Sequence, residues 1–314
     1  MGRAKRDFFI RKFSKSLCQL KSILSQSNDR KFLTLVWAVN ILQSKHRIDV
    51  RRHLNYPIGA GSTSFDSPFL IYKWELETIL SILLTTEKNA ESTLFDYKAF
   101  SFISEIINNL RSVENYEYSI MSDDNNDLVT ELHKTAHRQF PWQRGFELSE
   151  RLYRFAYIYG QGSSDTFFKE KYKIDVKEFI YYGFMMYAQM IRSPWIDFID
   201  IPRLDIKASR FIEIVGIFSK DLEDLRFESG LLLKSSLLNN KYNVSYTPSA
   251  LRMYPIIRCT NSNKYISPLP QLILFRVTNG IYYDTCSAPQ RVLEEANKRF
   301  ENYTGMLING FFLD

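Results

Sequence analysis

The sequence has few of the residues that build metal clusters and disulfide frameworks. Its 314 residues include three cysteines and four histidines, and no CxxC pair occurs. A sparse, odd number of cysteines argues against a disulfide framework and favours reduced thiols in a cytoplasm. Because structural zinc sites built on cysteine use closely spaced pairs, a cysteine-based zinc cluster is excluded as well.

Long hydrophobic runs are also missing. Crossing a bilayer takes roughly 20 consecutive apolar residues, whereas the best run, residues 32–42, is about half that length and contains Asn40. The basic N-terminus is not followed by an uninterrupted apolar segment, so we expect no secretory signal. We therefore expect a soluble, cytoplasmic protein that does not insert into a membrane.

The motifs of the large enzyme families are absent too. The segment IGAGSTS at residues 58–64 is rich in glycine, but it lacks the lysine of a phosphate-binding loop and follows no convincing strand. No Gly-x-Ser-x-Gly elbow occurs. From the residues alone we predict no catalytic residue and no cofactor.

Two histidines have a spacing that could bind a metal. His133 and His137 are four residues apart in a predicted helix, which places both rings on one face. The usual helical zinc motif has Glu directly after the first His, and here that residue is Lys134. Two polar helix positions explain the pair, so we predict no bound metal.

A metal-dependent nuclease would need an Asp followed by an Asp/Glu-x-Lys triplet, in which carboxylates hold the metal and lysine orients water. Two triplets occur, Asp96-Tyr97-Lys98 and Asp205-Ile206-Lys207. Capping explains Asp96, which starts a predicted helix, and a proline separates the second triplet from the preceding Asp200. Neither triplet is predicted to lie on a strand, so a divergent metal-dependent nuclease is kept only as an alternative.

Helical periodicity runs through most of the chain. Hydrophobic residues make up 45% of it and aromatic residues 15%, enough to bury a sizeable core. Apolar residues recur at steps of three and four, which is typical of amphipathic helices. The predicted helices cover about 9–24, 31–44, 72–85, 96–111, 127–139, 147–159, 175–191, 206–238, 271–284 and 288–311. We therefore predict a mainly α fold, a multi-helix bundle.

The pattern changes near residue 242. Short β-type runs occur there, YNVSYTP, PIIRC and KYISP, and TNSN at residues 260–263 fits a hairpin turn between the last two. This predicts a small β-hairpin insertion near residues 242–270. The acidic, polar stretch at 114–127 predicts a surface loop or a boundary. We accordingly divide the chain into a basic N-terminal helical subdomain (1–115) and a helical subdomain with the hairpin (127–314), or treat it as one domain.

The net charge of +6 is concentrated at the N-terminus. Residues 1–31 contain nine Lys or Arg and two Asp, a charge of +7, so the rest of the chain sums to about −1. An amphipathic helix there could contact the phosphates of nucleic acid, or it could be a peripheral helix that only solvates its cations. The candidate nucleic-acid-binding residues are Arg3, Lys5, Arg6, Arg11, Lys12 and Lys15.

Four segments resemble a known group of proteins. They are SPFLIYKWELETIL (67–80), TAHRQFPWQ (135–143), YISPLPQLILFRVTNGIYYD (265–284) and RFENYTGMLI (299–308). In this order they resemble the helical N-terminal region of uncharacterised bacterial proteins associated with anti-phage defence or mobile-element loci. In that group a PD-(D/E)xK nuclease domain commonly follows, and no such domain is found in this sequence, so no catalytic residue carries over.

The resemblance implies a non-catalytic scaffold, sensor or regulatory component that works with a separately encoded nuclease or ATPase subunit. A phage-encoded inhibitor or structural protein is a further alternative. The shared residues also have structural explanations. Trp142 can fill the core after a helix-ending turn, and Arg276 can form a buried polar pair with the Tyr282–Asp284 segment.

Overall fold

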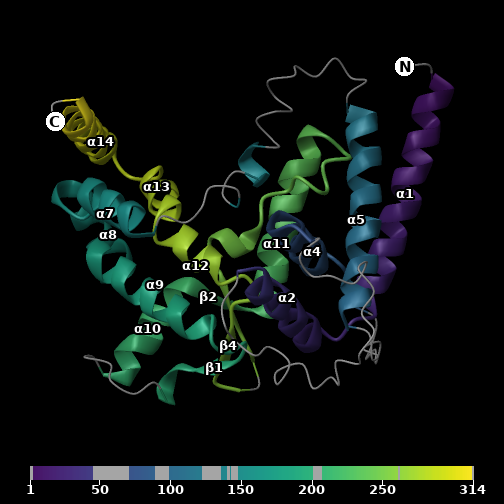
Figure 1. The fold of residues 1–314 in the computed structure, drawn as a ribbon, viewed down its shortest axis with the longest axis horizontal. Helices are drawn as coiled ribbons and strands as arrows, with labels where there is room; N and C mark the ends of the chain where they lie inside the picture. The colour runs from purple at the N-terminus through teal and green to yellow at the C-terminus, as the bar shows by residue number, and fades with distance from the viewer. Residues whose placement is uncertain are drawn as a thin grey trace.

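The computed structural model describes residues 3–44, 71–88, 99–121, 136–139, 142, 148–200, 207–260 and 262–312. These residues are mainly helical and contain one small sheet, which confirms the predicted fold class. The N-terminal and C-terminal helices lie at opposite sides of the molecule, and the sheet lies between the two halves (Figure 1).

In the described part of the chain, the first half contains the helices α1 (Arg3–Ser25), α2 (Asp29–Gln43), α4 (Lys73–Leu84) and α5 (Ala99–Met121). α1 packs along α5, and α4 contacts α1, α2 and α5. Phe13, Leu20 and Leu24 of α1 are buried, as their spacing predicts. The N-cap of α2 is Asn28, whose Oδ1 accepts a hydrogen bond from Lys31 N at 3.0 Å. Asp29, next to this cap, is the first residue of the helix.

The second half contains α7 (Leu148–Tyr159), α8 (Gly162–Tyr172), α9 (Val176–Met190), α10 (Ala208–Phe218) and α14 (Gln290–Phe312). Asp175 caps α9, and Glu178 completes a capping box by accepting a hydrogen bond from Asp175 N at 3.0 Å. Aromatic rings fill the interior. Phe179 stacks on Phe218 with 4.6 Å between centroids.

The sheet joins the halves. Its strands are β1 (Ile196–Asp197), β2 (Ser219–Asp221), β3 (Ile256–Arg258) and β4 (Lys264–Ile266), in the order β1-β4-β3-β2. β3 and β4 form the predicted antiparallel hairpin, β1 adds antiparallel to β4, and β2 adds parallel to β3. The remaining elements are α11 (Leu222–Asn239), α12 (Gln271–Arg276), α13 (Asn279–Thr285) and the short 3-10 turns 198–200 and 250–252.

The hairpin separates two hydrophobic cores. The first core contains buried residues of α1, α2, α4, α5 and segment 242–272, and the second contains those of α7 to α10, α13 and α14. Successive residues of a strand point to opposite faces. Accordingly Ile257 and Ile266 belong to the first core, whereas Ile256 and Tyr265 belong to the second.

Several predictions about element boundaries were wrong. The predicted loop at 114–127 is helical up to Met121 because α5 continues, and residues 122–127 lie outside the described part. The predicted helix 206–238 is interrupted by β2, which pairs with the distant strand β3. The run YNVSYTP forms turns instead of a strand, and helix 271–284 is divided at Val277–Thr278. The division into residues 1–115 and 127–314 stays a prediction, although the first core includes residues from both segments.

Candidate nucleic-acid interface

The outer face of α1 carries an exposed strip of cations around an aromatic ring. Lys5, Phe8, Arg11, Lys12 and Lys15 are all exposed. Neighbouring members are three or four residues apart along the strip, so each lies next to another on the helix surface. At 1.5 Å per residue the strip is about 15 Å long. We call these five residues the α1 strip.

The opposite face of α1 holds the helix in place. Phe9 contacts Tyr116 of α5, with 6.3 Å between ring centroids, and Phe13 meets the ring of Tyr242 edge-on at 5.6 Å. Because these contacts come from two different elements, they set the rotation of α1 about its own axis. The α1 strip therefore points away from the body of the protein.

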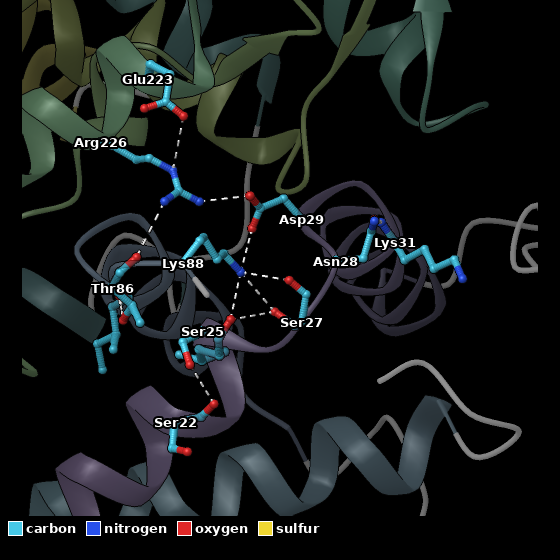
Figure 2. A network of polar contacts seen from close by, with 12 residues as sticks. Ser22, Ser25, Ser27, Asn28, Asp29, Lys31, Thr86, Lys88, Glu223 and Arg226 are labelled. Carbon is cyan, nitrogen blue, oxygen red and sulfur yellow. Dashed lines mark hydrogen bonds and ion pairs between the residues drawn. The ribbon is translucent and has the colours of Figure 1, made fainter. Parts of the chain in front are cut away.

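A polar network fixes the C-terminal end of α1 (Figure 2). The Lys88 ammonium donates to Leu24 O at 2.7 Å and to Ser27 O at 2.8 Å, and it lies 2.7 Å from Asp29 Oδ1. A cation here satisfies carbonyls that the last helical turn leaves free, and it complements the helix dipole. Burial lowers the pKa of Lys88, although the neighbouring Asp29 opposes this effect.

Arg226 of α11 extends the same network. Its Nη2 donates to Asp29 Oδ2 at 2.8 Å, and its Nη1 donates to Thr86 O at 3.4 Å (Figure 2). The network thus connects the turn between α1 and α2 with the end of α4 and with α11. We call Asp29, Lys88 and Arg226 the Asp29 network.

No ion pair neutralises the cations of the α1 strip within the part of the chain that the structure describes. Among the described residues, none of Lys5, Arg11, Lys12 and Lys15 has an ion-pair partner. Arg11 and Lys15 are four residues apart and Lys12 and Lys15 three apart, and like charges at these spacings destabilise a helix slightly. A polyanion bound along the strip would relieve this repulsion.

Known proteins offer no guide to this surface. No family model, curated protein or solved structure matches the chain. The chemistry of its side chains is therefore the basis for interpretation. Within the described ranges, no helix is long and apolar enough to cross a membrane, and no three His, Cys, Asp or Glu side chains are grouped to hold a metal.

Three carboxylates of α4 and α5, Glu75, Glu77 and Glu114, are engaged with arginines. Glu75 forms a bidentate pair with Arg111, at 2.6 and 3.0 Å, and also caps α4 by accepting from Tyr72 N at 2.8 Å. Glu77 forms a second bidentate pair with Arg252, at 2.6 and 3.1 Å. Two parallel N–H···O bonds of this kind hold geometry strongly, so both glutamates connect the helix to other elements.

A polar cleft lies beside these pairs. Its lining includes Glu77, Arg252, His137 and Arg138 together with hydroxyl side chains of segment 245–249. Arg138 bonds Glu114 and donates from Nε to Thr78 Oγ1 at 3.0 Å. We call the ion pairs Glu75–Arg111, Glu77–Arg252 and Glu114–Arg138 the α4 network.

Glu117 differs from the glutamates of the α4 network. It is fully buried on α5, and its carboxyl oxygens accept from Ser245 N at 3.2 and 3.4 Å. No cation pairs with it in the described part of the chain. Burial raises the pKa of Glu117 to about 8, because a carboxylate loses its hydration there.

The second half contains the buried pair that the sequence predicted. Arg276 Nη1 donates to Asp284 Oδ2 at 2.5 Å, which confirms the expected pairing. Asp284 Oδ1 also accepts from Tyr172 OH at 2.6 Å and from Lys171 Nζ at 3.1 Å. Arg276 Nε donates to Met253 O at 3.1 Å, so the pair connects α8, α12 and α13 with segment 250–256.

The residues singled out from the sequence include the cations of α1 and Trp142. Lys5, Arg11, Lys12 and Lys15 are exposed on α1, Arg6 is half-buried, and Arg3 begins the helix. Trp142 packs against the first core as expected, and its Nε1 donates to Glu77 Oε2 at 2.7 Å.

The remaining candidates are the histidine pair and the carboxylate triplets. His137 lies beside Arg252, whose Nη1 donates to His137 O at 3.1 Å, whereas His133 lies outside the described residues. The triplet at 96–98 and residues 205 and 206 lie outside them as well. Lys207 is the N-cap residue of α10.

The sequence interpretation missed Phe8. The residues predicted for the basic face of α1 were all cations. Phe8 is 45% exposed, and Lys12 Nζ lies 5.5 Å from its ring centroid. The spacing in the sequence places Phe8 on the same helix face as the cations, since it is three residues from Lys5 and Arg11 and four from Lys12.

Proposed function

We propose that this protein is a non-catalytic scaffold, sensor or regulatory component of a bacterial anti-phage defence or mobile-element system. In this proposal it acts with a separate nuclease or ATPase subunit and contacts nucleic acid through the α1 strip. The observation that carries the nucleic-acid part is the row of exposed cations on the outer face of an anchored helix, which form no ion pair among the described residues. Phosphate backbones are the polyanions that such a row binds best.

The carboxylates that are paired with arginines support a non-catalytic role. Glu75, Glu77 and Glu114 are paired with arginines, and Asp284 is paired with Arg276. Each pair connects two different helices or segments, which is a structural role. A divergent nuclease would need carboxylates that are free to hold a divalent cation.

The first experiment separates binding from cleavage. The purified protein is incubated with labelled duplex DNA and with RNA in Mg²⁺ or Mn²⁺, and we expect binding without cleavage. Metal-dependent cleavage that is lost in Asp205→Ala would contradict the proposal and favour the nuclease alternative. Purification of the tagged protein from its own cells, followed by mass spectrometry, should recover a nuclease or ATPase subunit.

The second experiment locates the interface. Fluorescence anisotropy with a random 20-base-pair duplex is measured across a salt series for the wild type and for Arg11→Gln/Lys12→Gln/Lys15→Gln. Each lost phosphate contact should lower the logarithmic salt slope by roughly 0.9, so we expect weaker binding and a flatter slope. Phosphate contacts carry little sequence information, so binding should also be insensitive to duplex sequence.

A matched control removes the same charge elsewhere. Lys177, Lys234 and Lys298 are exposed on α9, α11 and α14. Their triple replacement by Gln lowers the net charge equally but leaves α1 intact, so its salt slope should equal that of the wild type. Equal slopes in both triple variants would move the interface away from α1.

A further inference from the structure

We infer that the α1 strip binds single-stranded nucleic acid, with the Phe8 ring as a platform for one base and the flanking cations as phosphate ligands. This inference rests on the proposed nucleic-acid contact and specifies its substrate class. It depends on Phe8, because cations alone do not distinguish a single strand from a duplex.

The position of Phe8 differs from that of the other aromatic residues on α1. Phe13 is 4% exposed and Phe9 is half-buried against α5, whereas Phe8 keeps 45% of its surface exposed. α1 is a long helix with a well-packed apolar face, so Phe8 contributes little to the core. Its ring remains accessible from solvent within a row of positive charge.

The geometry around the ring suits a nucleotide. Lys5 lies one helical turn before Phe8, and Arg11 and Lys12 lie one turn after it, so phosphates on either side of a stacked base would meet a cation. Lys12 Nζ already lies 5.5 Å from the ring centroid. A base that stacks on the ring can displace this ammonium towards the adjacent phosphate, because lysine is long and flexible.

A single strand fits this surface better than a duplex. Stacking on a protein ring requires an unpaired base, and proteins that bind single strands combine such rings with a basic groove or surface. In a duplex the bases are already stacked, and inserting a ring between them requires partial unstacking. The ring of Phe8 would therefore contribute to binding a single strand and very little to binding a duplex.

The test compares two probes and two kinds of substitution. Anisotropy is measured with fluorescein-labelled dT20 and with a 20-base-pair duplex at low salt. Phe8→Ala should weaken dT20 binding roughly 5-fold to 100-fold, the range that one lost base stack gives, and change duplex binding less than about twofold on the same basis. Phe8→Trp, which keeps a stacking surface, should retain dT20 binding.

Two controls test whether a loss of dT20 binding in Phe8→Ala is specific to this ring and not caused by misfolding. Tyr181→Ala removes an aromatic side chain of similar exposure, 50%, from the surface of α9 and should leave dT20 binding unchanged. Circular dichroism should show that Phe8→Ala keeps its helices. If it does not, the Phe8→Trp and Phe8→Leu pair provides the test, since only Trp should retain wild-type affinity.

The outcomes distinguish the inference from the proposal on which it rests. Binding of dT20 and duplex that falls equally in Arg11→Gln/Lys12→Gln/Lys15→Gln, with no special effect of Phe8→Ala on dT20, overturns the single-strand inference and leaves the interface standing. Wild-type binding in the triple variant overturns both, as does the absence of binding to either probe at low salt. Loss of dT20 binding in Phe8→Ala with duplex binding intact supports the inference.

Discussion

Two ion-pair clusters, one in each half of the molecule, differ in burial. In the first half, the Asp29 network lies at the rim of the core, and the side chains of Asp29, Lys88 and Arg226 are 23%, 20% and 16% exposed. In the second half, Arg276 and Asp284 are 2% and 1% exposed. A rim network keeps part of its hydration when one contact is lost, whereas a fully buried pair does not.

This difference in burial indicates which ion pairs contribute most to stability in each half. The Asp29 network connects helices at the rim of the first core, whereas the α4 network of the same half is largely buried. The second half depends on stacked rings and on one buried pair that connects α8, α12 and α13. We therefore expect substitutions in the Asp29 network to cost less stability than substitutions of Arg276 or Asp284.

Breaking each pair tests this comparison directly and should give the largest effect. Asp284→Asn leaves the Arg276 guanidinium buried without its counter-charge, and we expect a loss of about 3–5 kcal/mol in the free energy of unfolding. Asp29→Asn leaves Lys88 and Arg226 partly hydrated and should cost about 1–2 kcal/mol. Urea denaturation at pH 7 measures both losses. Equal losses would contradict the proposed contrast between rim and interior.

Packing in the second half should be the next most sensitive feature. A Cβ at Gly183 would lie 2.2 Å from Val277 Cγ1, so Gly183→Ala should cost about 1–3 kcal/mol through overpacking. A Cβ at Gly216 would meet no atom within 4 Å, so Gly216→Ala should be neutral or stabilise α10 by up to about 1 kcal/mol. Thermal unfolding of the two variants gives the comparison. A Gly183→Ala/Val277→Ala variant that loses as much as the two single changes added together would show that this contact is not the cause.

The buried carboxyl of the first half makes stability depend on pH. Because burial raises the pKa of Glu117 to about 8, the folded protein holds a proton that the unfolded chain releases above its ordinary pKa. The stabilising contribution is therefore complete below about pH 4 and declines as the pH rises to 8. Relative to the wild type, Glu117→Gln should gain several degrees in Tm between pH 5 and pH 8. A constant difference across this range would show that Glu117 does not titrate there.

A carboxylate at the edge of the second half should show the opposite trend and the smallest effect. Glu295 accepts hydrogen bonds from Ser163 Oγ at 2.7 Å and from Ser163 N at 3.1 Å, and these lower its pKa to about 2. Its contribution is present above the unfolded pKa and is lost as the pH falls towards 2.

The matched variant for this prediction is one residue away. Glu295→Ala should have a lower Tm than Glu294→Ala at pH 7, because Glu294 is exposed and does not cap α8. The difference should narrow as the pH is lowered from 5 to 3. A difference that is the same at both pH values would rule out the carboxylate as its source.

Local patterns explain what could be predicted. The helices around Phe13, Asp175 and residues 148–159 follow from apolar spacing and capping residues, which act over a few positions. Arg276 could be paired in advance with the Tyr282–Asp284 segment because both lie in one apolar stretch, and the structure shows that its partner there is Asp284, eight residues away. The same local logic identified the cations of the α1 strip, and applied to every residue of that helix it would have included Phe8.

The amino-acid sequence by itself therefore determined the helical character of the chain, the β3–β4 hairpin and the concentration of positive charge on α1. Only the tertiary structure decided that β2 interrupts a helical segment, that Arg252 pairs with a glutamate 175 residues earlier, and that Lys88 caps α1. The physical reason is the distance along the chain over which each interaction acts. Helical periodicity and turn chemistry depend on neighbours along the chain, whereas strand pairing and ion pairing depend on which distant segments the two cores bring together.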